Sequence, residues 1–316
     1  NYFKKQQLKT KTPDQLFNIF MNDCFFIVDY YKSKGKEVED FSKEADNVLN
    51  AKMVYTLCKY IEARMRNEGL RTHMDQIVDT INFFKTYKSY IPQFEHILVD
   101  EYQDVNDLQI ELIALLKAPN LFCVGDPRQS IFGWRGSNIK YILDFQKQYE
   151  DSEVVSLRKN YRSSKVIVNF MNEAIRPMAL PKLDSDKNGG KKVKLINFKN
   201  EDVEFEFVLQ SILASSVARK DIFVLARTNR QLTNLSRLFN ERGISHITKG
   251  DDTKMVEASE GQVTLATVHA IKGLEAEMVF VIGCTMNNFP CKGSEHPVVD
   301  LIKTDEYDKE EEERRL

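Results

Sequence analysis

Several features that mark particular protein classes are scarce or missing in this sequence. The five cysteines are odd in number and show no CxxC spacing, so they do not indicate a disulfide framework. Two of them, Cys123 and Cys284, lie in or beside apolar runs and are predicted to be reduced core residues. No signal peptide is found, and no apolar run approaches the length that spans a bilayer. We therefore expect no membrane partner and a cytoplasmic protein.

An excess of charge of one sign is also missing. The formal net charge is −2, so no overall basic field indicates nucleic acid. Any contact with DNA must therefore come from local positive grooves and from stacking. Hydrophobic residues make up 42% of the 316 residues, which is enough for two domains with cores of their own.

A third absence concerns the phosphate-binding loop of P-loop nucleotide hydrolases. No GxxxxGK(S/T) pattern occurs anywhere in the chain. The first residue is Asn1 rather than Met, and the last residues, up to Leu316, form a charged run. We therefore expect this chain to be the middle piece of a longer protein.

Two short apolar runs, 96–99 and 121–124, each end in polar residues. This pattern predicts two buried parallel strands whose C-terminal ends meet at the edge where α/β folds place ligands. The polar residues at that edge are Asp100 and Glu101 after the first run, and Gln129, Trp134 and Arg135 after the second.

The acid pair Asp100–Glu101 fits the chemistry of a metal–nucleotide site. Mg²⁺ takes one or two carboxylates together with phosphate oxygens and water, and a neighbouring acid can orient the attacking water. The alternative for the pair alone is a solvated strand end.

Longer segments around these residues resemble a known family. Residues 100–104 read DEYQD, and residues 125–137 read GDPRQSIFGWRGS. They resemble motifs II and III of the UvrD/Rep/PcrA family of superfamily 1 DNA helicases, which usually read DE(F/Y)QDT and GDxxQSIYGWRGA. The departures are Val105 for Thr, Phe132 for Tyr and Ser137 for Ala, and none of them changes a polar group assigned below.

The resemblance implies a role for each polar group at the strand ends. Asp100 would hold Mg²⁺, Glu101 would position the attacking water, and Gln129 would sense the γ-phosphate. Trp134 would be a base-stacking platform with Arg135 beside it. A core aromatic is the alternative for Trp134, but its glycine neighbours favour a loop.

A third segment, KNYRS at residues 159–163, resembles motif IV, usually xNYRS. The resemblance implies that Tyr161 stacks on adenine and that Arg162 is an arginine finger for the γ-phosphate. The alternative for so short a motif is a helix cap.

A fourth segment, TVHAIKGLE at residues 267–275, resembles motif V, usually TxHxxKGLE. The resemblance implies that Thr267 and His269 hold a DNA phosphate. It also implies that Glu275 accepts a hydrogen bond from the nucleotide ribose, with Lys272 and Gly273 in the same nucleotide-binding set.

Hydrophobic periodicity and the resemblance together predict an α/β fold with two RecA-like domains and parallel sheets. Residues 1–95 are predicted to be a helical segment, 96–152 the C-terminal part of the first domain, and 153–316 the second domain. The stretch 251–262 is too short for the helical insertion of larger family members, so we expect that insertion to be missing. Within the second domain, we expect strands at 153–157, 193–198, 222–226 and 278–283, helix faces within 205–213 and 232–239, and a mobile turn at 184–190.

These observations predict part of an ATP-dependent 3′–5′ DNA helicase or translocase. With ATP and Mg²⁺, it would couple hydrolysis in the interdomain cleft to movement on single-stranded DNA. We expect the chain alone to be inactive as an ATPase, and the parent to be nucleoid-associated, a monomer or weak oligomer, with accessory repair or replication proteins as candidate partners. The alternatives are a nucleic-acid scaffold without ATPase activity, the helicase portion of a helicase–nuclease, and an ATPase that translocates without unwinding.

Overall fold

A computed structural model describes residues 2–44, 48–250, 257–289, 297–301 and 309–316. Contacts divide the chain into two compact units, which are described separately. Unit 1 contains Asn1–Val154 and Ser294–Asp308, and unit 2 contains Val155–Gly293 and Lys309–Leu316. In the described part of the chain, no helix has both the length and the apolar character needed to cross a bilayer.

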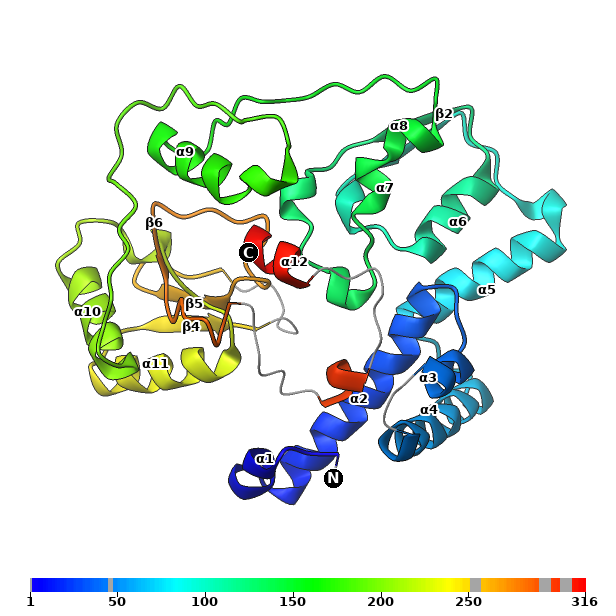
Figure 1. The fold of residues 1–316 in the computed structure, drawn as a ribbon, viewed down its shortest axis with the longest axis horizontal. Coiled ribbons are helices and arrows are strands. Elements are labelled where there is room, and N and C mark those ends of the chain that lie inside the picture. The colour runs from blue at the N-terminus through cyan, green and yellow to red at the C-terminus, as the bar shows by residue number, and fades with distance from the viewer. Residues whose placement is uncertain (1, 45–47, 251–256, 290–296, 302–308) are drawn as a thin grey trace. The chain divides into compact units, whose positions relative to one another are not determined.

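The first part of unit 1 is helical, as its periodicity predicts (Figure 1). The second helix begins at Pro13 and is capped by Thr12, whose hydroxyl accepts from the backbone N–H of Gln15. Its buried face packs with the third and fourth helices in one apolar core that includes Ile27, Phe41 and Val54. The helices are α1 (Lys5–Thr10), α2 (Pro13–Ser33), α3 (Val38–Glu44), α4 (Val48–Asn67) and α5 (His73–Thr86).

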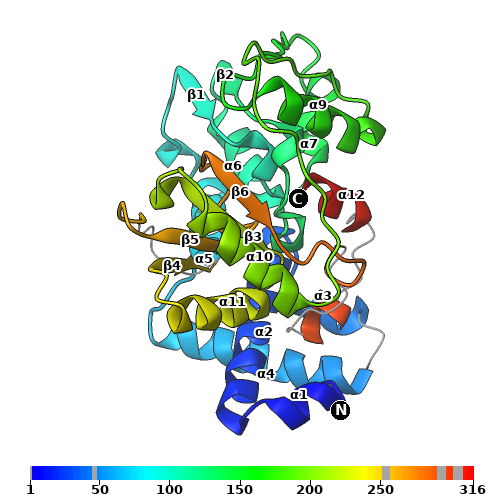
Figure 2. The same cartoon turned by 90° about the vertical axis from the view of Figure 1, so that its left-hand side faces the viewer.

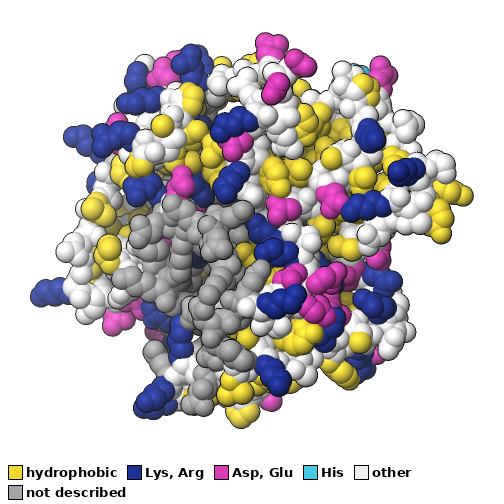
Figure 3. Space-filling view, turned by 45° about the vertical axis from the view of Figure 1, so that its right-hand side comes forward, with side chains coloured by type: hydrophobic (Ala, Val, Ile, Leu, Met, Phe, Trp, Pro, Cys, Tyr) yellow, Lys and Arg dark blue, Asp and Glu magenta, His cyan; other side chains and the backbone are white. Residues whose placement is uncertain are grey.

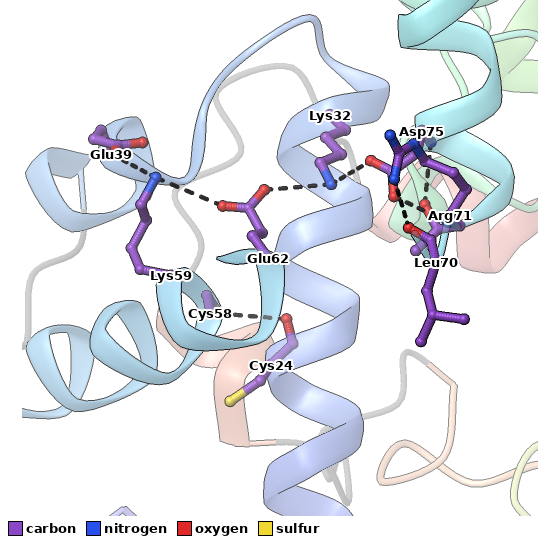
Figure 4. Close-up of polar contacts among 10 residues, drawn as sticks. Cys24, Lys32, Glu39, Cys58, Lys59, Glu62, Leu70, Arg71 and Asp75 are labelled. Atoms are coloured by element: carbon purple, nitrogen blue, oxygen red, sulfur yellow. Dashed lines mark hydrogen bonds and ion pairs between the residues drawn. The ribbon is translucent and has the colours of Figure 1, made fainter. Parts of the chain in front are cut away.

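Charged side chains also join three of these helices (Figure 4). The ammonium group of Lys32 on α2 lies 3.3 Å from Glu62 on α4 and 2.6 Å from Asp75 on α5. All three side chains are less than a fifth exposed, so the pairs are screened less than surface pairs. Beneath them, the Cys58 thiol donates to the backbone carbonyl of Cys24 at 3.3 Å, and both cysteines are buried.

The rest of unit 1 is built on a small parallel sheet. Strands β1 (His96–Val99) and β2 (Asn120–Cys123) pair in parallel, with Val99 opposite Cys123. Helix α6 (Asp107–Leu116) connects them, and Asn106, a residue type that favours this position, caps it: its side chain accepts from Gln109 N at 3.0 Å. The shorter helices α7 (Lys140–Leu143) and α8 (Phe145–Gln148) follow.

The parallel pairing is confirmed, but the prediction that both strands are buried is wrong. Val99 and Cys123 face a core formed with Tyr102 and Phe145. On the opposite face Leu98 is 73% exposed and Phe122 is 61% exposed. Alternate residues of a strand point to opposite faces, and the described helices cover only one face of this sheet. Burial also raises the pKa of the Cys123 thiol to about 11.

Unit 2 contains a four-stranded parallel sheet of strand order β4-β5-β3-β6. One face of the sheet, including Val224 and Leu265, packs against two helices in a single apolar core, and Figure 2 shows these helices beside the strands. The other face, including Phe223 and Ala266, is covered by Ile271 from the segment that follows β5. The strands are β3 (Ile222–Ala226), β4 (His246–Lys249), β5 (Val263–Thr267) and β6 (Met278–Val281). The helices are α9 (Lys165–Ala174), α10 (Glu201–Leu213), α11 (Asn229–Glu241) and α12 (Lys309–Arg315), and α10 and α11 cover the first face.

Helix α11 ends at Glu241, and Gly243 lies just beyond its last turn. This glycine has φ +68°, and its N–H donates to the carbonyl of Asn240. The next residue, Ile244, donates to Phe239 O at 2.8 Å and is buried with it in the core. Both bonds belong to a Schellman motif, which satisfies the last carbonyls of the helix.

Short 3-10 turns connect these elements. They are η1 (Lys88–Tyr90), η2 (Tyr102–Asp104), η3 (Pro127–Gln129), η4 (Gly133–Arg135), η5 (Arg176–Met178), η6 (Arg219–Asp221) and η7 (Pro297–Leu301).

The predicted α/β class, with parallel sheets and an N-terminal helical segment, is confirmed. Two of the predicted strands, 153–157 and 193–198, are wrong: neither segment pairs with a neighbouring strand among the described residues. Their apolar side chains are accordingly exposed, with Leu157 at 86% and Leu195 at 94%. An alternating pattern favours a strand, but a strand forms only beside a partner with free hydrogen-bonding groups.

The expectation that the helical insertion is missing concerns a stretch that the structure describes only in part, and it stays a prediction. Between β4 and β5 only residues 250–262 are available, and 251–256 lie outside the described part. Both α10 and α11 pack on the sheet rather than forming a separate bundle. The core prediction for Cys284 is wrong, because β6 ends at Val281 and Cys284 is exposed in the turn beyond it.

The distribution of surface charge agrees with the small net charge. On the face drawn in Figure 3, the described Lys and Arg side chains are interspersed with Asp and Glu. Neither sign forms a continuous field over that face.

Candidate functional site

The ends of β1 and β2 present the predicted acidic pair at the surface of unit 1. Asp100 and Glu101 directly follow β1, and both are exposed. Glu101 has φ 52° and ψ 42°, a left-handed conformation that costs a residue with a Cβ about 1–2 kcal/mol. The Asp100 carboxylate accepts from the N–H of Glu101 at 2.8 Å. The turn therefore holds the Glu101 side chain in one direction at the strand end.

Gln103 connects this turn to the loop after β2. Its side chain is completely buried. The amide oxygen accepts from Asp126 N at 2.9 Å, and the amide nitrogen donates to the Glu101 carboxylate. Asp126 in turn accepts from the Gln129 side chain at 3.3 Å. A chain of hydrogen bonds thus runs from Glu101 to Gln129, which brings these two predicted residues to one edge.

Sequence reasoning gave Gln103 no role. Its position inside DEYQD was the available signal, since a buried glutamine must satisfy its amide with specific partners. Arg128 was also missed: it lies beside Asp126, with its guanidinium 3.1 Å from the carboxylate.

Further hydrogen bonds fix the loop that carries Trp134 and Arg135. The Ser137 hydroxyl donates to Asp104 O at 2.7 Å, and Asn138 N donates to Val105 O at 3.0 Å. The loop is thereby attached to Asp104 and Val105 in the segment that follows β1.

Trp134 itself is half-buried on the turn η4, as a loop position predicts. The guanidinium carbon of Arg135 lies 4.6 Å from the centre of the Trp134 ring. At that distance the cation is attracted to the ring face. Arg135 is exposed, so both predicted DNA-binding side chains lie at the surface of one loop.

In unit 2, Asn160 shapes the turn that carries the next two predicted residues. Its side-chain oxygen accepts from Arg162 N at 3.0 Å and from Ser163 N at 2.8 Å. Tyr161 is therefore turned outward and is 72% exposed, with the ammonium group of Lys159 5.5 Å from its ring centre. A flat, exposed ring of this kind is able to stack on a base.

Two predicted nucleotide-binding residues of unit 2 meet directly. The Arg162 guanidinium donates to the Glu275 carboxylate at 2.7 Å, although 113 positions separate them in the chain. Both side chains are more than half exposed, so the pair contributes little to stability. Glu275 follows a tight turn in which Gly273 has φ +86°, a conformation suited to glycine. Lys272 lies beside it, half-buried.

The remaining predicted pair is less accessible. Thr267 ends β5 and is 3% exposed, and its hydroxyl accepts from Ala270 N at 3.1 Å. His269 is 6% exposed. Contact of either side chain with a DNA phosphate requires the residues that cover them to move.

The turn that carries Tyr161 and Arg162 is held by a segment that we expected to be mobile. Residues 159 and 184 form a parallel bridge, and Asn160 N donates to Asp184 O at 2.7 Å. Ser185 is buried and donates to Ser163 O, and the Lys187 ammonium group donates to Arg162 O at 2.9 Å. The prediction of a mobile turn is therefore wrong for residues 184–187. Polar residues of the kind that favour turns here form hydrogen bonds with the backbone of the neighbouring segment 160–163.

Comparisons with known proteins agree with the motifs. Residues 2–150 match the UvrD/REP helicase N-terminal domain, and residues 155–260 and 247–316 match the UvrD-like helicase C-terminal domain. The ATP-dependent DNA helicase PcrA of Staphylococcus epidermidis is 37% identical over 232 residues, which cover 69% of this chain and 32% of that protein. PcrA of Staphylococcus aureus is 35% identical over 231 residues, with the same two coverages. The chain thus spans about a third of the length of these relatives.

Proposed function

This chain belongs to the UvrD/Rep/PcrA-like helicase family, and from that premise we propose that it is part of an ATP-dependent DNA helicase or translocase. The parent protein couples ATP hydrolysis in the interdomain cleft to movement along single-stranded DNA in the 3′ to 5′ direction. ATP is the substrate of the motor, and Mg²⁺ is its metal.

One observation carries the proposal. Glu101, Gln103, Asp126 and Gln129 form a continuous hydrogen-bonded edge at the C-terminal ends of two parallel strands. Open α/β sheets bind their ligands at this edge. Gln103 is completely buried between the two loops and its amide bonds to both of them, which supports one built site rather than two independent surface loops.

The donor set at this edge suits Mg²⁺. Asp100 offers an exposed carboxylate, which is a hard oxygen ligand. Among the described residues, no three or more His, Cys, Asp or Glu side chains form a cluster that could hold a metal ion by themselves. A metal held by one carboxylate, with phosphate oxygens and water filling its other positions, is typical of nucleotide sites. Asp100 would hold the ion, which neutralises charge on the phosphates when bound.

Glu101 and Gln129 act on the hydrolytic step itself. The Glu101 carboxylate orients the attacking water and accepts its proton, while the new bond to the γ-phosphorus forms and the bond to ADP breaks. The Gln129 amide contacts the γ-phosphate. Gln129 lies in the same loop as Trp134, and Gln103 contacts that loop through Asp126. Binding of the γ-phosphate by Gln129 would therefore also affect the loop that carries Trp134.

Unit 2 supplies the remaining groups. Tyr161 stacks on adenine, and Arg162 stabilises negative charge on the transferring phosphoryl group, which is worth about 10³–10⁵ in rate in nucleotide hydrolases. The bond between Arg162 and Glu275 must open before the arginine reaches a phosphate. Glu275 is then released to accept from the ribose, with Lys272 and Gly273 beside it.

Single-stranded DNA binds by stacking and by local contacts rather than by a broad basic surface. Trp134 stacks on a base, a contact worth about 1–3 kcal/mol. Arg135 lies beside it, and Thr267 and His269 contact a phosphate once the residues over them move. Accessory repair or replication proteins remain candidate partners, and a monomer or weak oligomer remains the expected state.

We expect this chain alone to have negligible ATPase activity, because it contains no phosphate-binding loop and no lysine for the β- and γ-phosphates. The rival function is a DNA-binding scaffold whose motor is inactive in the parent too. The hydrogen-bonded edge around Gln103 favours the motor, since a scaffold needs no ordered carboxylate at a strand end.

The test is ATP hydrolysis by the full-length parent with and without single-stranded DNA. Strong stimulation by DNA, lost in both Glu101→Gln and Arg162→Ala, supports the motor. DNA binding without any ATP turnover would replace the motor with the scaffold. Gln210→Leu, at an exposed position on α10, serves as the control and should keep full activity.

A further inference from the structure

The loop that carries Trp134 is packed on the helical segment of unit 1, at a contact that none of the motifs contains. The Phe26 ring on α2 is stacked with the Trp134 ring, with 6.2 Å between their centres and 22° between their planes. An offset, nearly parallel arrangement of this kind is a favourable geometry for two aromatic rings.

Phe26 is itself fixed on its helix. It packs against the buried core that α2 shares with α3 and α4. One turn further along, Tyr30 is stacked on it with a centre-to-centre distance of 5.7 Å and an interplanar angle of 28°. The three rings Tyr30, Phe26 and Trp134 therefore form a row that begins in the helical core and ends at the loop.

A second contact joins the same loop to the same helix. Gly136 has φ +96°, and a Cβ placed there would lie 2.0 Å from the hydroxyl of Ser33, at the end of α2. Ser33 is buried, and its hydroxyl donates to Tyr30 O at 2.7 Å, so it has little freedom to move away. The backbone of the loop thus approaches α2 closely at Gly136, two residues after the ring contact made by Trp134.

We propose that Phe26 is a positioning residue for single-stranded DNA binding: it holds the indole of Trp134 at the angle at which a base stacks. The inference rests on the proposed DNA-binding function. It assigns the helical segment a part in the DNA site, because a nucleobase that takes the place of the Arg135 guanidinium on the Trp134 ring forms one continuous stack with Trp134 and Phe26. If the Trp134 side chain were free to rotate, binding a base would fix it, and the conformational entropy lost would weaken the binding.

Trp134 is the only tryptophan of the chain, so its fluorescence reports this site alone. We would titrate the chain with a fluorescein-labelled oligo(dT), following Trp134 emission and, separately, the anisotropy of the label. Phe26→Leu keeps an apolar side chain against the core and removes the ring. We expect it to weaken oligo(dT) binding about 2- to 10-fold and to shift Trp134 emission to longer wavelength.

Two further variants separate positioning from stability. Phe26→Tyr keeps the ring and should bind within about twofold of wild type, whereas a purely structural role would not depend on the ring. Phe25→Leu changes a 40% exposed phenylalanine at the adjacent position, about 100° around the helix, and should leave binding unchanged. Far-UV circular dichroism shows whether each variant keeps its helices.

The outcomes are distinct. Phe26→Leu that binds oligo(dT) as tightly as wild type, with the same Trp134 emission, overturns the inference and leaves the proposed function standing. Equal losses in Phe26→Leu and Phe26→Tyr also overturn it. If oligo(dT) changes neither wild-type Trp134 emission nor the anisotropy of the label, the DNA-binding function fails and the inference fails with it.

Discussion

Replacing Gln103 with leucine tests the hydrogen-bonded edge at the strand ends. Leucine fills nearly the same buried volume, so the cavity left behind is small. The partly buried Asp126 N–H loses its partner at 2.9 Å, and a donor left unsatisfied away from water costs about 1–3 kcal/mol. The Glu101 carboxylate loses a donor as well, but it is exposed and recovers water in exchange. We therefore expect Gln103→Leu to lower the free energy of unfolding of unit 1 by about 1–3 kcal/mol.

Urea unfolding followed by tryptophan fluorescence measures this loss in the right unit, because Trp134 lies in unit 1. With a slope of about 2 kcal/mol per M urea, the unfolding midpoint should fall by about 0.5–1.5 M. The matched control is Gln129→Leu, an exposed glutamine bonded to the same aspartate, for which we expect a change within about 0.5 kcal/mol. Equal midpoints for the two variants would refute the reasoning, since burial would then make no difference to the amide.

Two further predictions concern unit 2. Gly283 has φ +65°, and an added Cβ would lie 1.7 Å from the buried Gln231 side chain. Thermal unfolding followed by circular dichroism should therefore show a loss of about 2 kcal/mol or more for Gly283→Ala. At Gly243 the φ is similar but the space is open, so Gly243→Ala should cost only about 1 kcal/mol, and equal losses would contradict the steric argument. Arg227→Ala leaves the buried Glu313 carboxylate without its bidentate partner. In the same assay this variant should lose about 3 kcal/mol of unfolding free energy, and a loss under about 1 kcal/mol would show that the ion pair does not hold α12 in place.

The sequence was informative wherever a signal was local. The strand β3, the cap at Asn106 and the end of α11 at Gly243 each follow from a few neighbouring residues whose backbone preferences agree. The order of the motifs also placed Glu101 and Gln129 at one edge, because parallel strands end on the same side.

The sequence was uninformative where the deciding contact is distant. Residues 153–157 contain the valine and leucine side chains typical of a strand, yet Leu157 is exposed, because no pattern within five residues shows whether a partner strand is present. Phe26 has the helical spacing of a core residue, and its stacking with Trp134, more than a hundred positions later, leaves no trace in that spacing. Gln103 is intermediate: its motif was recognised, but only the fold shows that its amide is buried.

The left-handed backbone at Glu101 sets the cost of a strained conformation against a hydrogen bond that only a side chain supplies. Glycine adopts this conformation without the clash of a Cβ, which would stabilise unit 1 by about 1 kcal/mol. Glu101→Gly also removes the acceptor of the buried Gln103 amide, and an orphaned buried donor costs about 1–3 kcal/mol. The two effects have opposite signs and similar size, so selection for resistance to heat alone gives no reason to replace the carboxylate that we propose orients the attacking water.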